Sequence, residues 1–566
     1  MDMKKVIFIL AAIMAAACTQ APKVVYVQDY LTDEMLAGDA YPAIRAALEE
    51  CLKSDGSTLV FPGGTLPVKD TYCYEKYQHI SNNDPSEKRI AFDIEGVDGL
   101  TIEGNGTLLL FSGFISPFYI ENSTDISISG LNIDYTRTFN SEGTIIATGK
   151  DWVEVKFPDD YDIKIQSGLL VFKDKTGVTY PYGNLLEFDS VKKEVAHYVH
   201  DYWVWGDGLQ AEALPNGNYK IYEKGFEGTP GNTLVFGAAA RINPAFTLDG
   251  CEGFTLRDVN IWHCGGMGVI AQRSKDLELN HVQVVPSPGK DRMISITADA
   301  THFINCKGFI RMIDCTFTNQ KDDATNIHGW YSVAQKKVSG NQLVLWSNYG
   351  MDFAHPGMSL ELVDHNNMMT YDTLKVKAVE KYNSEYSLVT FEENIPEHFK
   401  ETDALADADA NPDVLIKGCH FGSNRARGLL IGSRGHVVIE DNHFHVPGTA
   451  ILFEGDGNYW YEQSGVRDVT IRGNTFENCL YGSKTWGPAY IAVGSGIPDR
   501  ETSRYHRNIT VEGNTFNTFD PRILNLYCCD GVVYKDNKVV MNEDYVFGRP
   551  ADSFVIKNCD NVNISE

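Results

Sequence analysis

A short pattern of alternating apolar and polar residues recurs along most of the chain. Each copy holds a few alternating positions and a bend of Gly, Asp, Asn or His. One of Asn, Cys, Val or Leu follows, and then another apolar residue. The copies read TIEGNGT, SISGLNI, TLRDVNI, ELNHVQV, MIDCTF, LIKGCHF, VIEDNHF, TIRGNTF, TVEGNTF and VYKDNKV. Alternation of this kind predicts short strands, each with one buried face.

The residue after the bend falls at positions 105, 131, 259, 282, 315, 419, 442, 474, 514 and 537, and three of these spacings are 23 residues. A period of this size is typical of one coil of a right-handed parallel β-helix, in which equivalent side chains of neighbouring coils stack in rows. A leucine-rich repeat is excluded because its leucines and helices are missing, and a β-propeller would need longer repeats. The residues expected to stack at one bend are Asn442, Asn474, Asn514 and Asn537, with Cys315 and Cys419 continuing the row.

Two of the spacings are far longer than one coil. They are 128 residues between positions 131 and 259, and 104 residues between positions 315 and 419. Subtracting one coil leaves insertions of about 100 and about 80 residues. Both contain alternating segments, such as GTIIATGKDWVEVKF and QLVLWSNYGMDF, so we expect two small inserted β-domains resembling barrels. Near the start, YPAIRAALEEC has helical spacing, which predicts a helix that caps the first coil.

The expected organisation follows from these boundaries. It is a signal peptide (1–17), a cap with the first coils (18–135), a first inserted domain (136–245), coils with the candidate catalytic residues (246–330), a second inserted domain (331–412) and the last coils (413–566).

The charge of the chain limits its partners. The 566 residues carry a formal net charge of −27, with no basic patch to neutralise phosphates, so a nucleic-acid partner is not expected. Strongly anionic polysaccharides are also disfavoured, unless a local basic site or a bound metal compensates. A neutral partner fits best. HExxH, P-loop and dinucleotide-binding motifs are missing, and no cofactor is expected.

The N-terminus has the features of a secretory signal. Lys4 and Lys5 precede an apolar run from Val6 to Ala17, which is too short to span a bilayer. It ends in Ala-Ala-Ala-Cys, which resembles the lipobox of bacterial lipoproteins and implies cleavage before Cys18 and lipid attachment to that thiol. We therefore expect lipid anchoring to a membrane of the Gram-negative cell envelope, facing the periplasm or the cell surface. An ordinary secretory signal with a chance cysteine is the alternative.

The cysteines after Cys18 are not arranged for disulfides or metal. They number eleven, which is odd, and include no CxxC pair. Several occupy the repeated position after the bend. We expect them to be buried as small hydrophobic side chains.

Two adjacent carboxylates, Asp322 and Asp323, lie in the segment NQKDDATNIHGW, seven and eight residues after the repeat position of their coil. The preceding coil is ten residues longer than the commonest spacing of 23. If those residues form the loop around PSPGKDRM, Asp299 takes the place equivalent to Asp322. The same count in the next coil puts Arg427 level with Asp323. We therefore expect three carboxylates and an arginine on one outer face.

Three carboxylates on neighbouring coils suit hydrolysis of a glycosidic bond. One acid must protonate the leaving oxygen while another activates water. Crowding of like charges raises the pKa of at least one of them. Inverting enzymes place their carboxyl groups roughly 6.5–9.5 Å apart, a separation that we expect between acids of neighbouring coils. An Asp-Asp pair is more often a solvated turn, but the third acid, Asn326 and His328 favour a site.

Other polar and aromatic side chains near these coils are candidates for contact with a sugar. The segment ILFEGDGNYW offers acids and a tryptophan, and AQRSKD and GKDRM offer an amide and two arginines. His263, in NIWHCGGMG, is expected to be a structural histidine. The side chains that we expect to bind substrate are Asn326, His328, Arg427, Glu454, Asp456, Trp460, Gln272, Arg273 and Arg292.

The segments TADATHF, NQKDDATNIHGW and GTAILFEGDGNYWYE, set in β-helix coils, resemble the bacterial α-1,3-galactosidases of glycoside hydrolase family 110. The resemblance implies an exo-acting, inverting, metal-independent enzyme that removes terminal α-1,3-linked galactose, as in blood group B antigen. It implies Asp322 as general acid, with Asp299 and Asp323 holding the attacking water. Whether linear Galα1-3Gal is also a substrate stays open, and a homo-oligomer is compatible with the sequence.

Three other readings compete. A β-helix polysaccharide lyase would use Arg427 beside the acids, and a polygalacturonase-like hydrolase would use the same trio, because the motif does not fix the sugar. A non-catalytic glycan-binding lipoprotein would keep the aromatic residues without needing three stacked acids.

Overall fold

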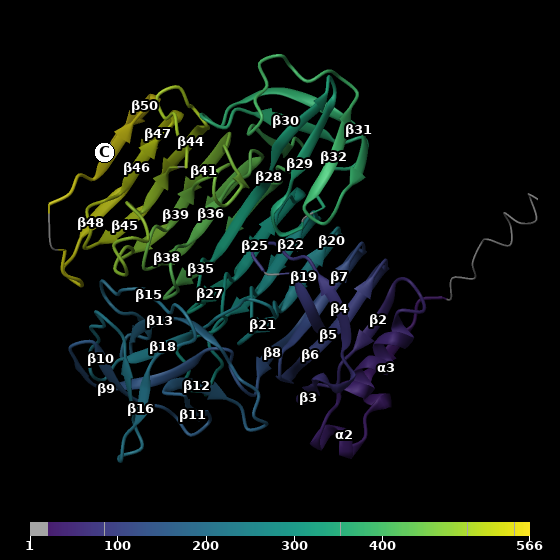
Figure 1. Cartoon of the computed structure of the whole chain (residues 1–566), viewed down its shortest axis with the longest axis vertical. Coiled ribbons are helices and arrows are strands. Elements are labelled where there is room, and N and C mark those ends of the chain that lie inside the picture. The colour runs from purple at the N-terminus through teal and green to yellow at the C-terminus, as the bar shows by residue number, and fades with distance from the viewer. Residues whose placement is uncertain (1–20, 84, 351, 495, 548–549, 566) are drawn as a thin grey trace, which may run out of the picture.

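The computed structural model describes residues 21–83, 85–350, 352–494, 496–547 and 550–565. Within them the chain winds into a parallel β-helix, with the inserted domains packed against it (Figure 1). Each complete coil contributes one strand to a straight sheet and two strands, separated by a bend, to a second sheet that we call the bent sheet. The fold class predicted from the repeat is confirmed.

Strands of successive coils pair in parallel in both sheets. The bent sheet holds β1 (Val24–Tyr26), β2 (Ser57–Val60), β3 (Thr65–Lys69), β6 (Asp98–Ser112), β8 (Thr124–Tyr135), β20 (Glu252–Arg257), β21 (Asn260–Ile261), β23 (Lys275–Asn280), β24 (Gln283–Val284), β26 (Lys307–Ile313), β27 (Thr316–Thr318), β34 (Asp413–Lys417), β35 (His420–Gly422), β37 (His436–Glu440), β38 (His443–His445), β41 (Asp468–Arg472), β42 (Thr475–Glu477), β44 (His506–Glu512), β45 (Thr515–Thr518), β47 (Cys529–Lys535), β48 (Lys538–Met541) and β50 (Asp560–Ile564). The straight sheet holds β5 (Ser86–Glu95), β7 (Ile115–Glu121), β19 (Phe246–Asp249), β22 (Val269–Gln272), β25 (Thr301–Ile304), β28 (Thr325–Ser339), β36 (Leu429–Ile431), β39 (Ile451–Phe453), β43 (Ile491–Val493), β46 (Leu524–Tyr527) and β49 (Phe554–Lys557), with β4 (Tyr74–Gln78) antiparallel to β5.

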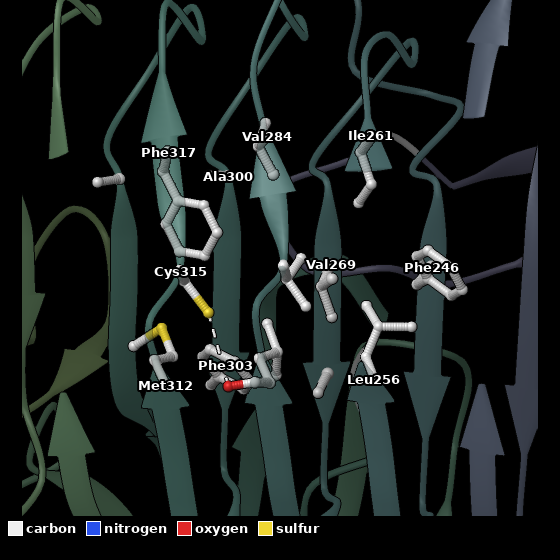
Figure 2. Close-up of a cluster of buried hydrophobic side chains, with 14 of the residues drawn as sticks. Phe246, Leu256, Ile261, Val269, Val284, Ala300, Phe303, Met312, Cys315 and Phe317 are labelled. Atoms are coloured by element: carbon white, nitrogen blue, oxygen red, sulfur yellow. Dashed lines mark hydrogen bonds between the residues drawn. The ribbon is translucent and has the colours of Figure 1, made fainter. Parts of the chain in front are cut away.

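The interior of the helix is a continuous apolar core. Side chains from both sheets point inward and stack on their equivalents in neighbouring coils, as Figure 2 shows for Ile261, Val284 and Phe317. Rings stack in the same way, with centroids 4.6 Å apart for Phe118 and Phe246. Each fully buried apolar side chain of this size stabilises the fold by roughly 1.5–3 kcal/mol. Alternation in the sequence therefore translates directly into core packing.

The residue before the stacked position at each bend adopts a left-handed conformation. Its φ lies between +52° and +66° at the bends of nine copies. L side chains with a bulky Cβ are disfavoured there, whereas Gly, Asp, Asn and His are tolerated. This explains the composition of the bend in the repeat. The nine residues are Gly130, Asp258, His281, Asp314, Gly418, Asp441, Gly473, Gly513 and Asp536.

The predicted asparagine row is present at this bend. Each Oδ1 accepts a hydrogen bond from the backbone N–H of the stacked residue one coil earlier, at 2.8–3.0 Å. Each Nδ2 donates to a strand carbonyl of the coil before, at 2.9–3.0 Å. The N–H of Cys315 continues the row by donating to Cys419 Sγ at 3.4 Å. The stacked residues are Cys315, Cys419, Asn442, Asn474, Asn514 and Asn537.

The N-terminal end of the β-helix is covered by the helix predicted there, α3 (Tyr41–Cys51). Its buried face joins the core, and the Tyr41 hydroxyl donates to the Ala91 carbonyl at 2.7 Å. The short elements η1 (Val27–Tyr30), α2 (Asp33–Ala37) and η2 (Asp70–Tyr72) flank it. No helix of the described residues is both long and apolar enough to cross a membrane.

The first insertion forms an antiparallel sheet with a core of its own. Its strands are β9 (Ser141–Gly149), β10 (Trp152–Lys156), β13 (Tyr182–Asp189), β14 (Glu194–Val195), β15 (Tyr202–Trp203), β16 (Ala211–Ala213), β17 (Tyr219–Tyr222) and β18 (Thr233–Ala238), with a separate hairpin of β11 (Asp162–Gln166) and β12 (Leu169–Lys173). The second insertion continues from β28 and forms a closed ring of strands. Its other elements are β29 (Gln342–Trp346), η3 (Asn348–Gly350), β30 (Ser359–Val363), β31 (Thr370–Lys381), β32 (Tyr386–Phe391) and β33 (Ala404–Asp407), and β40 (Glu462–Gln463) pairs with β28 from a later loop.

Nine of the eleven described cysteines are buried, and none of the eleven forms a disulfide. This agrees with their expected role as small hydrophobic side chains. Cys18 lies outside the described residues.

Replacement of one asparagine in the row should destabilise the protein. Asn474→Ala removes both the Oδ1 acceptor and the Nδ2 donor at a buried bend, which leaves backbone groups unpaired. The expected loss in the free energy of unfolding is about 1–3 kcal/mol, seen as a lower melting temperature in differential scanning fluorimetry. Asn563→Ala, at an exposed position of β50, should leave the melting temperature unchanged. Equal melting of the two variants would exclude a stabilising role for the row.

Candidate active site

The three predicted acids meet where two connections from the bent sheet, residues 285–300 and 319–324, return to the straight sheet. Thr301 of β25 pairs with Thr325 of β28, so Asp299 and Asp323 precede paired positions by the same two residues. The backbone confirms this, because Ala300 N–H donates to the Asp323 carbonyl at 3.1 Å. Arg427 holds the same place before β36 in the next coil.

The predicted alignment is wrong by one residue, because Asp299 is level with Asp323 and not with Asp322. The cause is a bulge in β26: Lys275 pairs with Lys307, but Leu277 pairs with Ile310. One residue of the long coil therefore sits in this strand, after Asp299, and not in the preceding loop.

The three carboxyl groups are compact and buried. One oxygen from each of Asp299, Asp322 and Asp323 lies within 4.8 Å of the others. Their side chains are only 5%, 10% and 4% exposed, respectively. The expected separation of 6.5–9.5 Å is therefore not found between the nearest oxygens. Neighbouring strands of one sheet are about 4.8 Å apart, and that spacing sets the distance between acids in register.

Arginines neutralise the adjacent pair. Arg425 Nη1 donates to Asp322 Oδ1 at 2.9 Å, and Arg241 Nη2 donates to Asp322 Oδ2. Arg427 donates to Asp323 from its backbone N–H and Nε at 3.0 Å and from Nη2 at 2.7 Å. Arg241 follows the first inserted domain, whereas the other two arginines lie on the coil after the acids. Ion pairs with this geometry offset the cost of burying two carboxylates side by side.

The environments of the paired acids differ. Burial favours the neutral form of Asp322, but the guanidinium groups of Arg241, Arg425 and Arg427 outweigh it and lower the pKa of this carboxyl. Burial raises the pKa of Asp323 to about 6, with Asp322 and Asp299 adding to the effect and Arg427 opposing it. One member of the pair therefore favours the carboxylate and the other retains a proton to higher pH.

A chain of hydrogen bonds links Asp299 to two histidines. Asp299 Oδ2 lies 2.6 Å from His302 Nδ1, and the Nε2 atoms of His302 and His328 are 3.0 Å apart. His328 Nδ1 lies 2.6 Å from the Gly329 carbonyl, which can only accept, so this nitrogen carries the proton. Burial lowers the pKa of His328 to about 3, so its Nε2 accepts and His302 Nε2 donates.

Glu462 closes the site from the loop that follows β39. Its Oε1 lies 3.4 Å from Asn326 Nδ2 and 3.6 Å from His328 Nε2. Burial raises the pKa of Glu462 to about 7. Two groups of ligand atoms could hold a metal ion: His302, His328 and Glu462, and the three aspartates. These groups equally provide donors and acceptors for sugar hydroxyls.

The remaining residues predicted for substrate contact divide into two sets. Two of them, Asn326 and His328, lie beside Glu462. Arg427 pairs with Asp323, and its Nη1 lies 3.9 Å from Oε2 of Glu454. Asp456 instead accepts the backbone N–H groups of Asn458, Tyr459 and Trp460, so it shapes the loop. Trp460 is 54% exposed on that loop.

Three predicted contacts lie elsewhere. Gln272 and Arg273 both hydrogen-bond to Asp249, at the far end of the straight-sheet strands, and Arg292 pairs with Asp134 beside the first inserted domain. Their guanidinium and amide groups are taken up by these buried partners, and this corrects the prediction of substrate contact. The prediction assumed that residues close to the acids in sequence also lie close to them in space. This assumption failed because the residues of one coil are distributed over several faces of the β-helix.

Four residues of the site were missed by the prediction. His302 stands in TADATHF, next to a recognised acid, and its alternation with Phe303 could have indicated the outer face. Arg425 lies two residues before Arg427, and Glu462 two residues after Trp460. Arg241 has no local signal, because it comes from the end of an insertion whose packing the sequence does not reveal.

His263 has the structural role expected of it. It is fully buried, and its Nε2 accepts from the Phe139 backbone N–H at 2.8 Å. Burial lowers its pKa to about 3, which keeps the ring neutral.

Family models match both insertions. GLAA-B beta-barrel domain I matches residues 141–234, and GLAA-B beta-barrel domain II matches residues 347–405. The alpha-1,3-galactosidase A of Shewanella woodyi is 32% identical over 526 residues, which are 90% of this chain and 84% of that relative. The chain belongs to the bacterial α-1,3-galactosidase family. Membership makes it a glycosidase that acts on galactosides.

Other α-1,3-galactosidases are similar along almost the whole chain. The alpha-1,3-galactosidase B of Bacteroides thetaiotaomicron is 28% identical, covering 99% of this chain and 93% of that relative. Among solved structures, the Yersinia enterocolitica family 28 exopolygalacturonase is 12% identical with a TM-score of 0.40, covering 96% of this chain and 78% of that chain.

The partly buried acid Glu462 should make the galactosidase less stable as the pH rises. Its folded-state pKa of about 7 lies above the ordinary value of about 4.3. Stability from this group is therefore present at low pH and lost as the pH rises through 7. Glu462→Gln should melt at a higher temperature than wild type at pH 8, and the gap should shrink toward pH 5.

The matched control is Glu543→Gln, at an exposed position. It should follow the wild-type melting curve at both pH values. A Glu462→Gln gap that does not change with pH would contradict the raised pKa.

Proposed function

We propose that this enzyme is an exo-acting, inverting α-galactosidase that releases terminal α-1,3-linked galactose from glycans such as blood group B antigen. The observation that carries the proposal is the buried trio Asp299, Asp322 and Asp323. Arginines pair with Asp322 and Asp323, and Asp299 is hydrogen-bonded to His302 at the start of the histidine chain. The names of the relatives supply the linkage.

The trio contains the parts that acid-base hydrolysis needs. We assign proton donation to the adjacent pair Asp322 and Asp323, which shares its protons unequally, and water activation to Asp299. Asp299 can take up the proton of the attacking water on the carboxyl oxygen that does not bond to His302, while the other oxygen keeps its hydrogen bond to His302. A retaining enzyme needs only an acid and a nucleophile. A third carboxylate provides a second oxygen to hold water, which supports inversion despite the short separation.

Within the pair, two considerations oppose each other. The family resemblance implies Asp322 as the donor, whereas the guanidinium groups on Asp322 favour its ionised form and leave the proton on Asp323. A comparison of substrates with good and poor leaving groups tests which of the two aspartates donates the proton.

The surroundings of the trio suit a terminal sugar. Segment 79–83 lies against the straight sheet on one side, where Ser81 N–H donates to Gln272 and Asn82 lies 3.5 Å from His302. On the other side, β40 pairs with β28 and brings Glu462 over the sheet. His302 and His328 thus lie between segment 79–83 and Glu462. A site enclosed on two sides supports exo action on the end of a glycan chain.

Proton NMR of purified enzyme tests the reaction. With Galα1-3Gal or the blood group B trisaccharide, β-galactose should appear before its α anomer, and Asp322→Asn should lose at least a hundredfold in rate, since proton transfer contributes about 10²–10⁴-fold. Initial release of α-galactose would establish retention instead. An unsaturated, ultraviolet-absorbing product would indicate a lyase.

Matched variants divide the roles within the trio. The proton donor's variant should still cleave an aryl α-galactoside whose leaving group needs no protonation, while losing the disaccharide. We compare Asp322→Asn, Asp323→Asn and Asp299→Asn on both substrates. If Asp299→Asn alone spared the aryl substrate, the assignment of Asp299 to water activation would be wrong.

We further propose that the mature chain is anchored through a lipid on Cys18. The apolar run and the Ala-Ala-Ala-Cys sequence support this. After growth with an alkyne-tagged palmitate, wild type should carry the label and partition with membranes, and Cys18→Ala should do neither. Cys73→Ala, at a cysteine that is incompletely buried in the described part of the chain, should keep the label. Labelling of Cys18→Ala would contradict the proposal.

A further inference from the structure

Arg425, the arginine on Asp322, lies between two tryptophans. Its guanidinium carbon is 5.7 Å from the ring centroid of Trp203 and 5.6 Å from that of Trp486. Its Nε donates to Asp201 at 2.7 Å, while its Nη1 holds Asp322. One side chain therefore separates the Trp203 ring from the catalytic pair.

The two tryptophans differ in exposure. Trp486 is 6% exposed and packs in a buried cluster, whereas Trp203 is 50% exposed. Trp203 is held by backbone pairing of β15 with β13, where it lies opposite Asn184. Among the described residues, no aromatic ring packs on Trp203, so much of this large apolar ring faces solvent. Ligand sites combine aromatic side chains with a few polar groups, and Trp203 with Arg425 presents that combination.

The position of Trp203 relative to the trio defines what it could bind. We assign the terminal galactose to the polar side chains of His302, His328 and Glu462, on the outer face of the straight sheet. Trp203 comes from the first inserted domain, and Arg425 connects it to Asp322. A proton donor must lie within hydrogen-bond reach of the glycosidic oxygen, which leaves with the departing sugar. The sugar beyond the bond therefore falls on the Trp203 side.

We propose that Trp203 forms a subsite for the sugar on the leaving-group side of the bond, binding the apolar face of a neutral hexopyranose. Its indole offers a broad, rigid face at low entropic cost, with the polar Arg425 beneath it. This subsite rests on the proposed function for its substrate. It assigns a binding role to the first inserted domain in addition to its contribution of Arg241.

Trp205 offers a matched control. It is 86% exposed and two residues farther along the same segment, and among the described residues no cation–π pair or ring contact joins it to the acids or their arginines. Replacing it removes the same exposed apolar group without touching the proposed subsite.

The test compares Trp203→Ala, Trp203→Phe and Trp205→Ala on two substrates. For the blood group B trisaccharide, Trp203→Ala should raise KM roughly tenfold, about 1.4 kcal/mol, with Trp203→Phe between it and wild type. For α-galactosyl fluoride, whose leaving group is a single atom that does not reach the subsite, kcat/KM and its pH profile should stay within about twofold of wild type. Trp205→Ala should match wild type on both.

Three results would overturn the subsite. They are an unchanged trisaccharide KM in Trp203→Ala, an equal loss on both substrates with a shifted pH profile, and the same KM increase in Trp205→Ala. The second would show that Trp203 only positions Arg425. Failure of the proposed function is distinguishable, because wild type would then cleave neither substrate. In that case titration with the trisaccharide, followed by tryptophan fluorescence, still compares binding by wild type and Trp203→Ala, and equal affinities would overturn the subsite.

Discussion

Parallel pairing of successive coils is the constraint on which this structure depends. Because strands in register are about 4.8 Å apart, residues distant in sequence become lateral neighbours. Asp323 thus meets Asp299, 24 positions earlier, and Arg427, which lies beyond the whole second insertion. The asparagine row uses the same register to satisfy buried backbone groups at every bend it occupies. A slip of one residue would turn the acids away from each other.

Register brings the acids together, but without compensating charges they would destabilise the folded state, because buried like charges repel each other and lose their hydration. The arginines resolve this, and they come from different parts of the chain. Arg427 is supplied by the next coil, whereas Arg241 follows the first inserted domain. That domain also brings Asp201 and Trp203 to Arg425. The insertion is therefore part of the site and not an appendage, and the unequal pKa values of Asp322 and Asp323 follow from how the arginines are shared.

The repeat allowed the β-helix, the cap helix, the bend and the stacked asparagines to be predicted, since each depends on local pattern or on period. The acids were located for the same reason. The one-residue error for Asp299 came from the bulge at Lys307 in β26, which no periodic count can detect. Gln272 and Arg292 were misplaced because a coil presents its residues to several faces, and partners such as Asp249 occupy them.

The sequence by itself determined the coil architecture and the presence of three acids near one face, because period and alternation act over short distances. Only the tertiary structure decided which arginine pairs with which aspartate. Arg241 reaches the trio from an insertion, and Glu462 reaches it from a late loop. Neither contact follows the period of the repeat, so the sequence pattern does not reveal it. Protonation depends on those contacts, since burial and the nearest charges set a pKa. The chemistry of Asp322 and Asp323 is thus a property of the folded arrangement, although the residues themselves are visible in the chain.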